Sequence, residues 1–489
     1  MKILMVSPEV APFSKVGGLG DVVGALSKEL ATLGHEVRVA TPRYGFLRPG
    51  PAWTPFPRPV SVHLGRGEDF CRVWEAPLGA SAARVEFIEF NRYYDRPAIY
   101  GGNGDGYGYQ DNLERFVFLC RAALEWCYAS EWIPEVVHGH DWTAALACVY
   151  LNTTDRARAL GRAASVLTIH NLQYQGYFGR ELLGFAGLPD ELFKADNLES
   201  MGAVNLLKGG LYHATKITTV SRNYAREIQT PEGGCGLHQL LRFRAADLIG
   251  VVNGIDPSEW NPATDPHLPA RFSAADLSGK AVCKDALQKR FGLAADARAP
   301  LFAVVARLVD QKGLDLLAAI VPSLMEETRL QLVVLGTGDP GLENAFRELA
   351  RRFPGRVGAR IGFDEALAHL IEAGADFFVM PSRFEPCGLN QMYSQRYGTP
   401  PIVRATGGLV DTVEPYLEGR GQGTGFLFFE PSTRALFHAL GWACGTFHDR
   451  PADLLALRRN GMGRDFSWTT SARQYEEIYG WAMQARREG

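Results

Sequence analysis

The stretch that decides the fold is MKILMVSPEVAPFSKVGGLGDVVGALSKELATLGHEVRVAT, residues 1–41. It opens with a short apolar run at 3–7, followed by a loop that contains Gly17-Gly18-Leu19-Gly20. Residues 21–33 then repeat apolar side chains at helical spacing. Gly34 ends this pattern, and residues 36–41 form the next apolar run. The order strand, glycine loop, helix, strand predicts a parallel sheet covered by helices.

The same order recurs along the chain and predicts two doubly wound α/β domains in series. Further strands of the first domain are expected at 85–90, 136–139, 166–170 and 217–221, and those of the second at 301–306, 331–335, 357–363, 377–381 and 401–405. The proline-rich stretch 254–269 marks the approximate boundary. We expect domains at 1–250 and 251–470. Residues 91–112, rich in Gly, Tyr and Asn, are predicted to form a long surface loop.

Composition limits the class of protein and its partners. Of 489 residues, 46% are hydrophobic and 21% charged, with a net charge of −3. This balance favours a globular enzyme and gives no reason to expect a nucleic-acid or membrane partner. Eight scattered cysteines without a C-x-x-C pair predict free thiols in a reducing compartment. No signal-peptide pattern or run of about 20 apolar residues is present, so we expect the cytoplasm.

Two candidate anion sites follow predicted strands. The first is the motif from Lys15 through Gly17, Gly18 and Asp21, where glycines let a ligand approach the backbone and a helix begins. An ordinary glycine-rich turn is the alternative. The second pairs Arg307 with Lys312, two cations that suit a pyrophosphate. A solvated loop would explain these charges equally well.

Two further groups follow other strands. In one, Glu385 precedes Cys387-Gly388-Leu389, where a carboxylate and main-chain amides could bind sugar hydroxyls; a capping turn is the alternative. The nearby turn Ala405-Thr406-Gly407-Gly408 would suit a phosphate. The other group joins His138-Gly-His140-Asp141 to Thr168-Ile-His170-Asn171. Its histidines could suggest a metal site, but no third-ligand cluster or Asp-x-Asp pair accompanies them.

Taken together, the motifs resemble the bacterial glycogen synthases and plant starch synthases of glycosyltransferase family five. The resemblance extends over nearly the whole chain and rests on KVGGLGDV at 15–22, YYDRPAIYG at 93–101, HGHDW at 138–142, TIHNLQYQG at 168–176, VVNGID at 251–256, ARLVDQKG at 306–313 and PSRFEPCGL at 381–389. Thr143 after Trp142 departs slightly from the usual pattern of the family.

The resemblance implies the GT-B fold, in which two Rossmann-like domains face an active-site cleft, and a last helix near 471–489 that returns to the first domain. It implies retaining transfer of glucose from ADP-glucose to the non-reducing end of glycogen or another α-1,4-glucan primer, with no metal and no cofactor.

The resemblance also implies roles for the residues that match the family motifs. Lys15 and the Gly17-Gly18 backbone would meet the distal phosphate and glucose, and His170 and Asn253 would hold the glucose. Arg307 and Lys312 would neutralise the pyrophosphate. The remaining expected ligand-binding residues are Asp21, Asp141, Gly336, Gly338, Glu385, Cys387, Gly388, Leu389 and Thr406.

Two other functions stay open at this point. Another GT-B nucleotide-sugar transferase would share part of the motif set, and a glucan-binding pseudoenzyme would share the fold. The second is disfavoured because Lys15, Arg307, Lys312 and Glu385 are all present. The preference for ADP-glucose over UDP-glucose rests on the resemblance alone.

Overall fold

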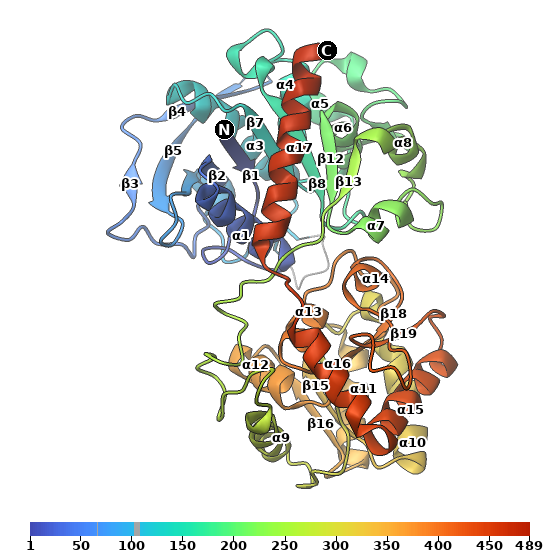
Figure 1. Cartoon of the computed structure of the whole chain (residues 1–489). Helices are drawn as coiled ribbons and strands as arrows, with labels where there is room; N and C mark the ends of the chain where they lie inside the picture. Colours follow the sequence, from blue (N-terminus) through green and yellow to red (C-terminus); the bar gives the residue numbers. More distant parts are fainter. Residues whose placement is uncertain (66, 102–107) are drawn as a thin grey trace. The chain divides into compact units, whose positions relative to one another are not determined.

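The computed structural model describes residues 1–65, 67–101 and 108–489, which form two α/β units (Figure 1). The first unit comprises Met1–Gly254 together with Trp468–Gly489, and the second comprises Ile255–Ser467. The chain therefore leaves the first unit once and returns to it with its last helix. Within the described residues, no helix is both long and apolar enough to cross a membrane.

The first unit is built on a mostly parallel sheet, with strand order β13-β12-β8-β7-β1-β2-β6-β5-β3 and β4 paired to β5. The parallel strands are β1 (Lys2–Val6), β2 (Glu36–Pro42), β6 (Arg84–Glu89), β7 (Val136–His140), β8 (Ala164–Ile169), β12 (Lys216–Thr219) and β13 (Leu248–Gly250). An antiparallel edge adds β3 (Thr54–Pro55), β4 (Val60–Leu64) and β5 (Gly67–Pro77). The sequence analysis predicted these parallel strands except β13, and it missed this edge.

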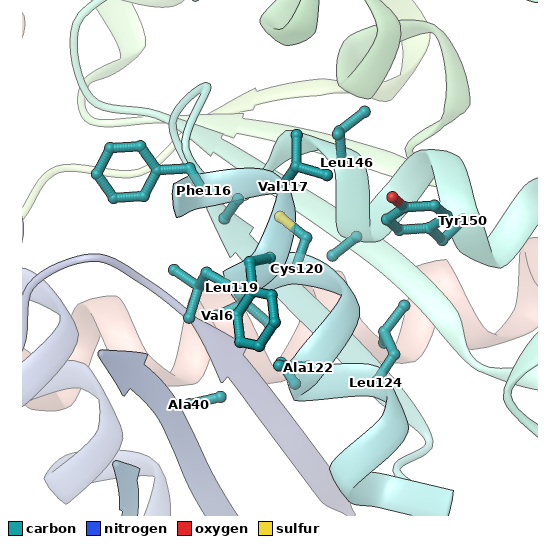
Figure 2. Packing of buried hydrophobic residues seen from close by; sticks show 14 of the residues in the cluster. Val6, Ala40, Phe116, Val117, Leu119, Cys120, Ala122, Leu124, Leu146 and Tyr150 are labelled. Atoms are coloured by element: carbon teal, nitrogen blue, oxygen red, sulfur yellow. The ribbon is translucent and has the colours of Figure 1, made fainter. Parts of the chain in front are cut away.

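Helices cover both faces of this sheet, which explains why its strands read as continuous apolar runs. In β1, Leu4 and Val6 pack into one core cluster while Ile3 and Met5 pack into the other. The first cluster lies against α3 (Asn112–Ala129) and α4 (Ala145–Asn152), and Figure 2 shows part of it. The second lies against α1 (Gly18–Thr32) and α17 (Trp468–Glu488), which contact each other.

The remaining elements of the first unit are short. They are the helices α2 (Asn91–Tyr94), α5 (Glu181–Ala186), α6 (Leu206–His213), α7 (Arg222–Glu227) and α8 (His238–Phe243), and a small antiparallel sheet of β9 (Tyr177–Phe178), β10 (Glu199–Ser200) and β11 (Ala203–Asn205).

The prediction of a surface loop over 91–112 is partly wrong. Residues 91–94 form α2, and both Tyr93 and Tyr94 are buried. The Tyr94 hydroxyl donates a hydrogen bond to the Arg115 carbonyl, and Arg115 is itself fully buried. Tyr93 and Tyr94 therefore belong to the core, because their apolar rings outweigh the neighbouring polar residues. Residues 102–107 lie outside the described residues.

The second unit contains a parallel sheet with order β16-β15-β14-β17-β18-β19. Its strands are β14 (Leu301–Val305), β15 (Gln331–Gly336), β16 (Val357–Ile361), β17 (Phe377–Met380), β18 (Pro401–Arg404) and β19 (Phe426–Phe428). Its helices are α9 (Ser278–Arg290), α10 (Leu314–Glu327), α11 (Pro340–Arg352), α12 (Glu365–Gly374), α13 (Asn390–Arg396), α14 (Gly408–Thr412), α15 (Thr433–Asp449) and α16 (Pro451–Met462). Phe302 and Val304 pack on one face, and Leu301 and Ala303 on the other.

Candidate active site

The glycine-rich loop of the first unit lies between β1 and α1, and it brings the predicted residues of this motif together. Helix α1 begins at Gly18, directly after Gly17, so its unpaired main-chain amides can bind an anion. The Lys15 ammonium forms an ion pair with Asp21 in the first turn of this helix, at 2.7 Å. Because half of the Lys15 side chain is exposed, this pair is weak and can exchange for a charged ligand.

Glu9 supports this loop, and sequence reasoning missed it. Its Oε2 atom accepts hydrogen bonds from the main-chain amides of Val16 (2.6 Å) and Gly17 (3.2 Å), while Oε1 accepts one from the Tyr100 hydroxyl (2.7 Å). Glu9 is buried, and burial raises the pKa of its carboxyl. The only sequence signal was an acidic residue close after an apolar strand, which does not reveal its partners.

Asp141 and His170 meet where β7 and β8 end. Asp141 has a φ of 58°, in the left-handed region, and its Oδ1 accepts hydrogen bonds from the amides of His170 (2.7 Å) and Asn171 (3.4 Å). Burial raises the pKa of the Asp141 carboxyl to about 7, and the negative charge of Glu9 adds a smaller upward effect. Glu9 therefore acts on Asp141 electrostatically, although no hydrogen bond joins the two carboxyls among the described residues.

The three histidines of this edge are neutral hydrogen-bonding groups. His138 hydrogen bonds with the Tyr479 hydroxyl through Nδ1 (2.8 Å) and with Thr168 through Nε2 (2.6 Å). His140 and His170 hydrogen bond through their rings at 3.0 Å. Burial lowers the pKa of His138 and His170 to about 3 and that of His140 well below its usual value. With both nitrogens of His138 engaged, the H-x-H motif does not form a metal site.

Asn253 follows β13 and belongs to the first unit by its contacts. Its side chain is buried, and among the described residues its Oδ1 atom has no hydrogen-bond partner. A buried amide oxygen without a partner costs free energy, so a ligand hydroxyl would satisfy it. The role expected for Asn253 thus has a physical basis in its surroundings.

In the second unit, Arg307 follows β14 and Lys312 lies in the short helical turn Asp310–Lys312. Arg307 is exposed and, within the described part of the chain, its guanidinium has no ion-pair partner. The Lys312 ammonium contacts Glu385 Oε2 at 2.6 Å, and the Ser382 hydroxyl donates to the same oxygen at 3.0 Å. Lys312 and Glu385, which the sequence analysis assigned to separate groups, therefore form one pair.

Neighbouring loops hold the turn that carries Glu385. Arg383 forms two 2.7 Å hydrogen bonds with the Asp315 carboxylate, and the Gln311 side chain donates to the Phe384 carbonyl at 3.2 Å. Gly407 has a φ of 47°, and a Cβ atom there would lie 1.8 Å from the Glu385 carbonyl oxygen. Only glycine allows this approach, so the turn at 405–408 fixes the backbone of Glu385.

Other predicted residues lie at the same edge of this sheet. Gly336 ends β15, Thr406 follows β18, and Cys387, Gly388 and Leu389 directly precede α13. For Gly336 and Gly338 the structure supplies a packing reason. A Cβ atom would lie 1.9 Å from the Ala306 carbonyl oxygen at Gly336, and 2.4 Å from that of Leu308 at Gly338.

Each unit thus gathers its predicted residues at the carboxyl ends of parallel strands, where α/β sheets bind ligands. The first unit offers a helix N-terminus, a lysine, a neutral histidine and buried acids. The second offers two cations and a carboxylate held in a rigid turn. A pair of Rossmann-like domains with such edges is the GT-B architecture of nucleotide-sugar transferases.

Comparisons with known proteins agree with this class. The starch synthase catalytic domain family matches residues 2–243, and the family of glycosyl transferases group 1 matches residues 285–443. Glycogen synthase 1 of Geobacter sulfurreducens is 48% identical over 489 residues, covering 99% of this chain and 97% of the relative. Glycogen synthase of Myxococcus xanthus is 48% identical over 481 residues, covering 98% and 99%. The chain belongs to the glycogen and starch synthase family.

Solved structures extend the comparison to the fold. The catalytic domain of Starch Synthase IV from Arabidopsis thaliana, bound to ADP and acarbose, superposes with a TM-score of 0.89 at 36% identity and covers 99% of both chains. Sucrose-phosphate synthase from Thermosynechococcus elongatus has a TM-score of 0.61 at 18% identity, again over 99% of both chains, and shares the fold. The GT-B prediction is confirmed.

Proposed function

We propose that this chain transfers glucose from ADP-glucose to the non-reducing end of an α-1,4-glucan, with retention of configuration at the anomeric carbon. It is a glycogen synthase by family and a glucosyltransferase by activity. The nucleotide is carried over from the Arabidopsis relative, which is bound to ADP. The observation that carries the proposal is the Lys312–Glu385 pair at the carboxyl edge of β14 and β17, the edge at which Arg307 also follows β14.

The second domain supplies the groups that a departing diphosphate needs. Breaking the bond from glucose to the diphosphate builds negative charge on the leaving oxygen, and fixed cations stabilise that charge most in the transition state. Arg307 is exposed, and Lys312 keeps further donor positions after bonding to Glu385. Glu385, held by Lys312 and Ser382, would accept hydrogen bonds from sugar hydroxyls.

The first domain would act on the same donor from its own sheet edge. Lys15 and the amides at Gly17 and Gly18 would bind the distal phosphate and the glucose. Because His170 is neutral, its ring can accept a hydrogen bond from a sugar hydroxyl or donate one to it. Asn253 has a buried side-chain oxygen without a partner among the described residues, and this oxygen could accept a hydrogen bond from another hydroxyl. Residues of both domains would thus act on the same donor molecule.

Retention would follow from front-face transfer. The acceptor hydroxyl would attack the anomeric carbon on the side that the diphosphate leaves, and the departing phosphate oxygen would take the acceptor proton. Retaining hydrolases instead use two carboxylates about 5 Å apart, one of them as a nucleophile. Glu385 Oε2 is paired with a cation and Asp141 Oδ1 accepts two main-chain hydrogen bonds, so both carboxylates suit a hydrogen-bond acceptor better than an attacking group.

A turnover assay tests the proposed function. Purified protein is incubated with glycogen and either radiolabelled ADP-glucose or radiolabelled UDP-glucose, and label in the precipitated glucan is counted. We expect incorporation from ADP-glucose to exceed that from UDP-glucose. Preference for UDP-glucose would overturn the assigned donor. Absence of turnover with both donors would overturn the enzyme assignment in favour of a glucan-binding pseudoenzyme.

A further inference from the structure

A group of metal-ligating side chains lies in the second domain, apart from the residues assigned to the sugar donor. Glu259, Glu365 and His369 place one coordinating atom each within 4.8 Å of the others. Glu259 belongs to the proline-rich stretch through which the chain enters this domain, and the other two lie four residues apart on α12. Residues at this spacing share one face of a helix.

The imidazole of His369 is prepared for a ligand. Its Nδ1 atom lies 2.7 Å from Asp265 Oδ2, an oxygen that also accepts a hydrogen bond from the Tyr397 hydroxyl at 2.5 Å. Because a carboxylate only accepts, Nδ1 carries the proton and Nε2 presents its lone pair. The His369 side chain is 2% exposed, and Nε2 is buried without a hydrogen-bond partner among the described residues. An ion at Nε2 would remove the cost of this buried, unpaired acceptor.

The orientation of the ring is also fixed. Trp260 stacks on His369 with ring centroids 3.9 Å apart and an angle of 9° between planes, and it stacks equally closely on Tyr393 at 3.8 Å and 11°. Since Glu259 is the neighbour of Trp260 in the chain, the same stack holds Glu259 above α12. The carboxylate–histidine arrangement of Asp265 and His369 is the one that orients histidine ligands at metal centres.

We propose that Glu259, Glu365 and His369 bind one divalent transition-metal ion of the zinc class, with Asp265 as a positioning residue. One imidazole and two carboxylates are ligands that Zn²⁺ accepts, and they leave a fourth tetrahedral position for water. An imidazole ligand favours such an ion over Mg²⁺, which prefers oxygen. The ion would fasten the proline-rich stretch to α12. It takes no part in glucosyl transfer, so the proposal stands independently of the proposed function.

The test uses the full-length protein carrying Cys235→Ser, since Cys235 is the exposed cysteine and could bind Zn²⁺ by itself. After dialysis against a chelator, binding of ZnCl₂ and MgCl₂ is measured by isothermal titration calorimetry. We expect one Zn²⁺ per chain and much weaker binding of Mg²⁺. Glu365→Gln should weaken Zn²⁺ binding by at least about tenfold, and it should abolish the rise in melting temperature that Zn²⁺ causes in the parent. Glu327→Gln, on α10 outside the group, is the matched control and should change neither.

Several outcomes would overturn the proposal. No stoichiometric Zn²⁺ binding, or equal binding in the parent and Glu365→Gln, would remove the site, and equal affinity for Mg²⁺ would remove the assigned class of ion. The role of Asp265 is tested with Co²⁺ bound in place of Zn²⁺, because the visible absorption spectrum of Co²⁺ depends on its ligands. Asp265→Asn should alter that spectrum and weaken binding by about ten- to a hundredfold. An unchanged spectrum and affinity would show that Asp265 only supports the fold.

Discussion

Replacing Lys312 by methionine separates the structural and catalytic contributions of one buried ion pair. The Lys312 ammonium lies 2.6 Å from Glu385 Oε2, with 19% of the lysine side chain and 7% of the glutamate side chain exposed. Lys289 and Asp285 form a pair at the same 2.6 Å distance on the surface, with 69% and 50% exposed. Lys289→Met is therefore a matched control with an equal distance between the charges and different burial.

The structure sets the expected loss of stability. Removing one partner of a buried pair leaves an uncompensated charge and costs about 3–5 kcal/mol. We expect the lower end, about 3 kcal/mol, because Lys312 is partly exposed and Ser382 still donates to Glu385. In a domain of roughly 200 residues this lowers the melting temperature by about 6–12 °C. The control should lose at most about 1 kcal/mol, the usual value of an exposed pair.

A double variant separates the two roles. In Lys312→Met/Glu385→Gln no charge is left unpaired, so most of the lost stability should return. The turnover number should stay at least about a hundredfold below the parent in both variants, since the cation that stabilises the leaving diphosphate is missing. Differential scanning fluorimetry gives the melting temperature, and glucose incorporation from ADP-glucose at saturating substrate gives kcat.

Two results would refute this reasoning. If Lys312→Met loses stability but keeps the parent kcat, the lysine is only a structural partner of Glu385. If the double variant regains activity along with stability, the loss in the single variant came from a displaced Glu385 turn and not from the missing cation.

The remaining predictions concern other parts of the site. Asp141 has a pKa of about 7 in the folded chain, above its ordinary value, so its contribution to stability is present below pH 4 and is lost as the pH rises through 7. By scanning fluorimetry, the melting temperature of Asp141→Asn should therefore exceed that of the parent at pH 8 and equal it at pH 4. The same difference in melting temperature at both pH values would contradict this. Glu9→Gln weakens charge-assisted hydrogen bonds to the amides at 16 and 17, so kcat/KM for ADP-glucose should fall by about tenfold or more in steady-state kinetics, with Tyr100→Phe falling less. EDTA should leave the initial rate unchanged if Arg307 and Lys312 take the place of a metal at the diphosphate, as proposed; a loss that Mn²⁺ or Mg²⁺ restores would refute this. Mass spectrometry of enzyme held with a slow fluorinated donor should find no glucosyl adduct, and a kinetically competent adduct on Glu385 or Asp141 would replace front-face transfer with a covalent mechanism.

The sequence predicted the parallel strands apart from the three-residue strands β13 and β19, because burial on both faces leaves a strong local signal. A strand covered by helices on both sides is apolar at every position, as in β14, and a glycine loop before a helix marks where it ends. The antiparallel edge at β3–β5 was missed because edge strands alternate with polar residues and lack this signal. Tyr93 and Tyr94 were misread because local composition does not show that their rings are buried.

The candidate residues at strand ends could also be predicted, since the carboxyl ends of parallel strands share one edge. What could not be predicted was the pairing among them. Lys312 and Glu385 are 73 residues apart, and Glu9 and Tyr100 are 91 apart. Such contacts depend on the register and twist of the sheet, which no local pattern contains. Glu9 was therefore missed although it holds the loop that carries Lys15.

The glycines show how packing and ligand binding lead to the same sequence signal. Gly336, Gly338 and Gly407 each lie where a Cβ atom would meet a carbonyl oxygen at 2.4 Å or less. Sequence reasoning took Gly336 and Gly338 as ligand-binding residues, and the structure adds a packing reason for both, the close passage of the backbone. Because these approaches bring the loops after β14, β15, β17 and β18 into contact, they also fix the edge on which Arg307 and Glu385 lie. A substitution at Gly407 would therefore act on Glu385 through its carbonyl oxygen, even though Gly407 itself has no side chain to offer a ligand.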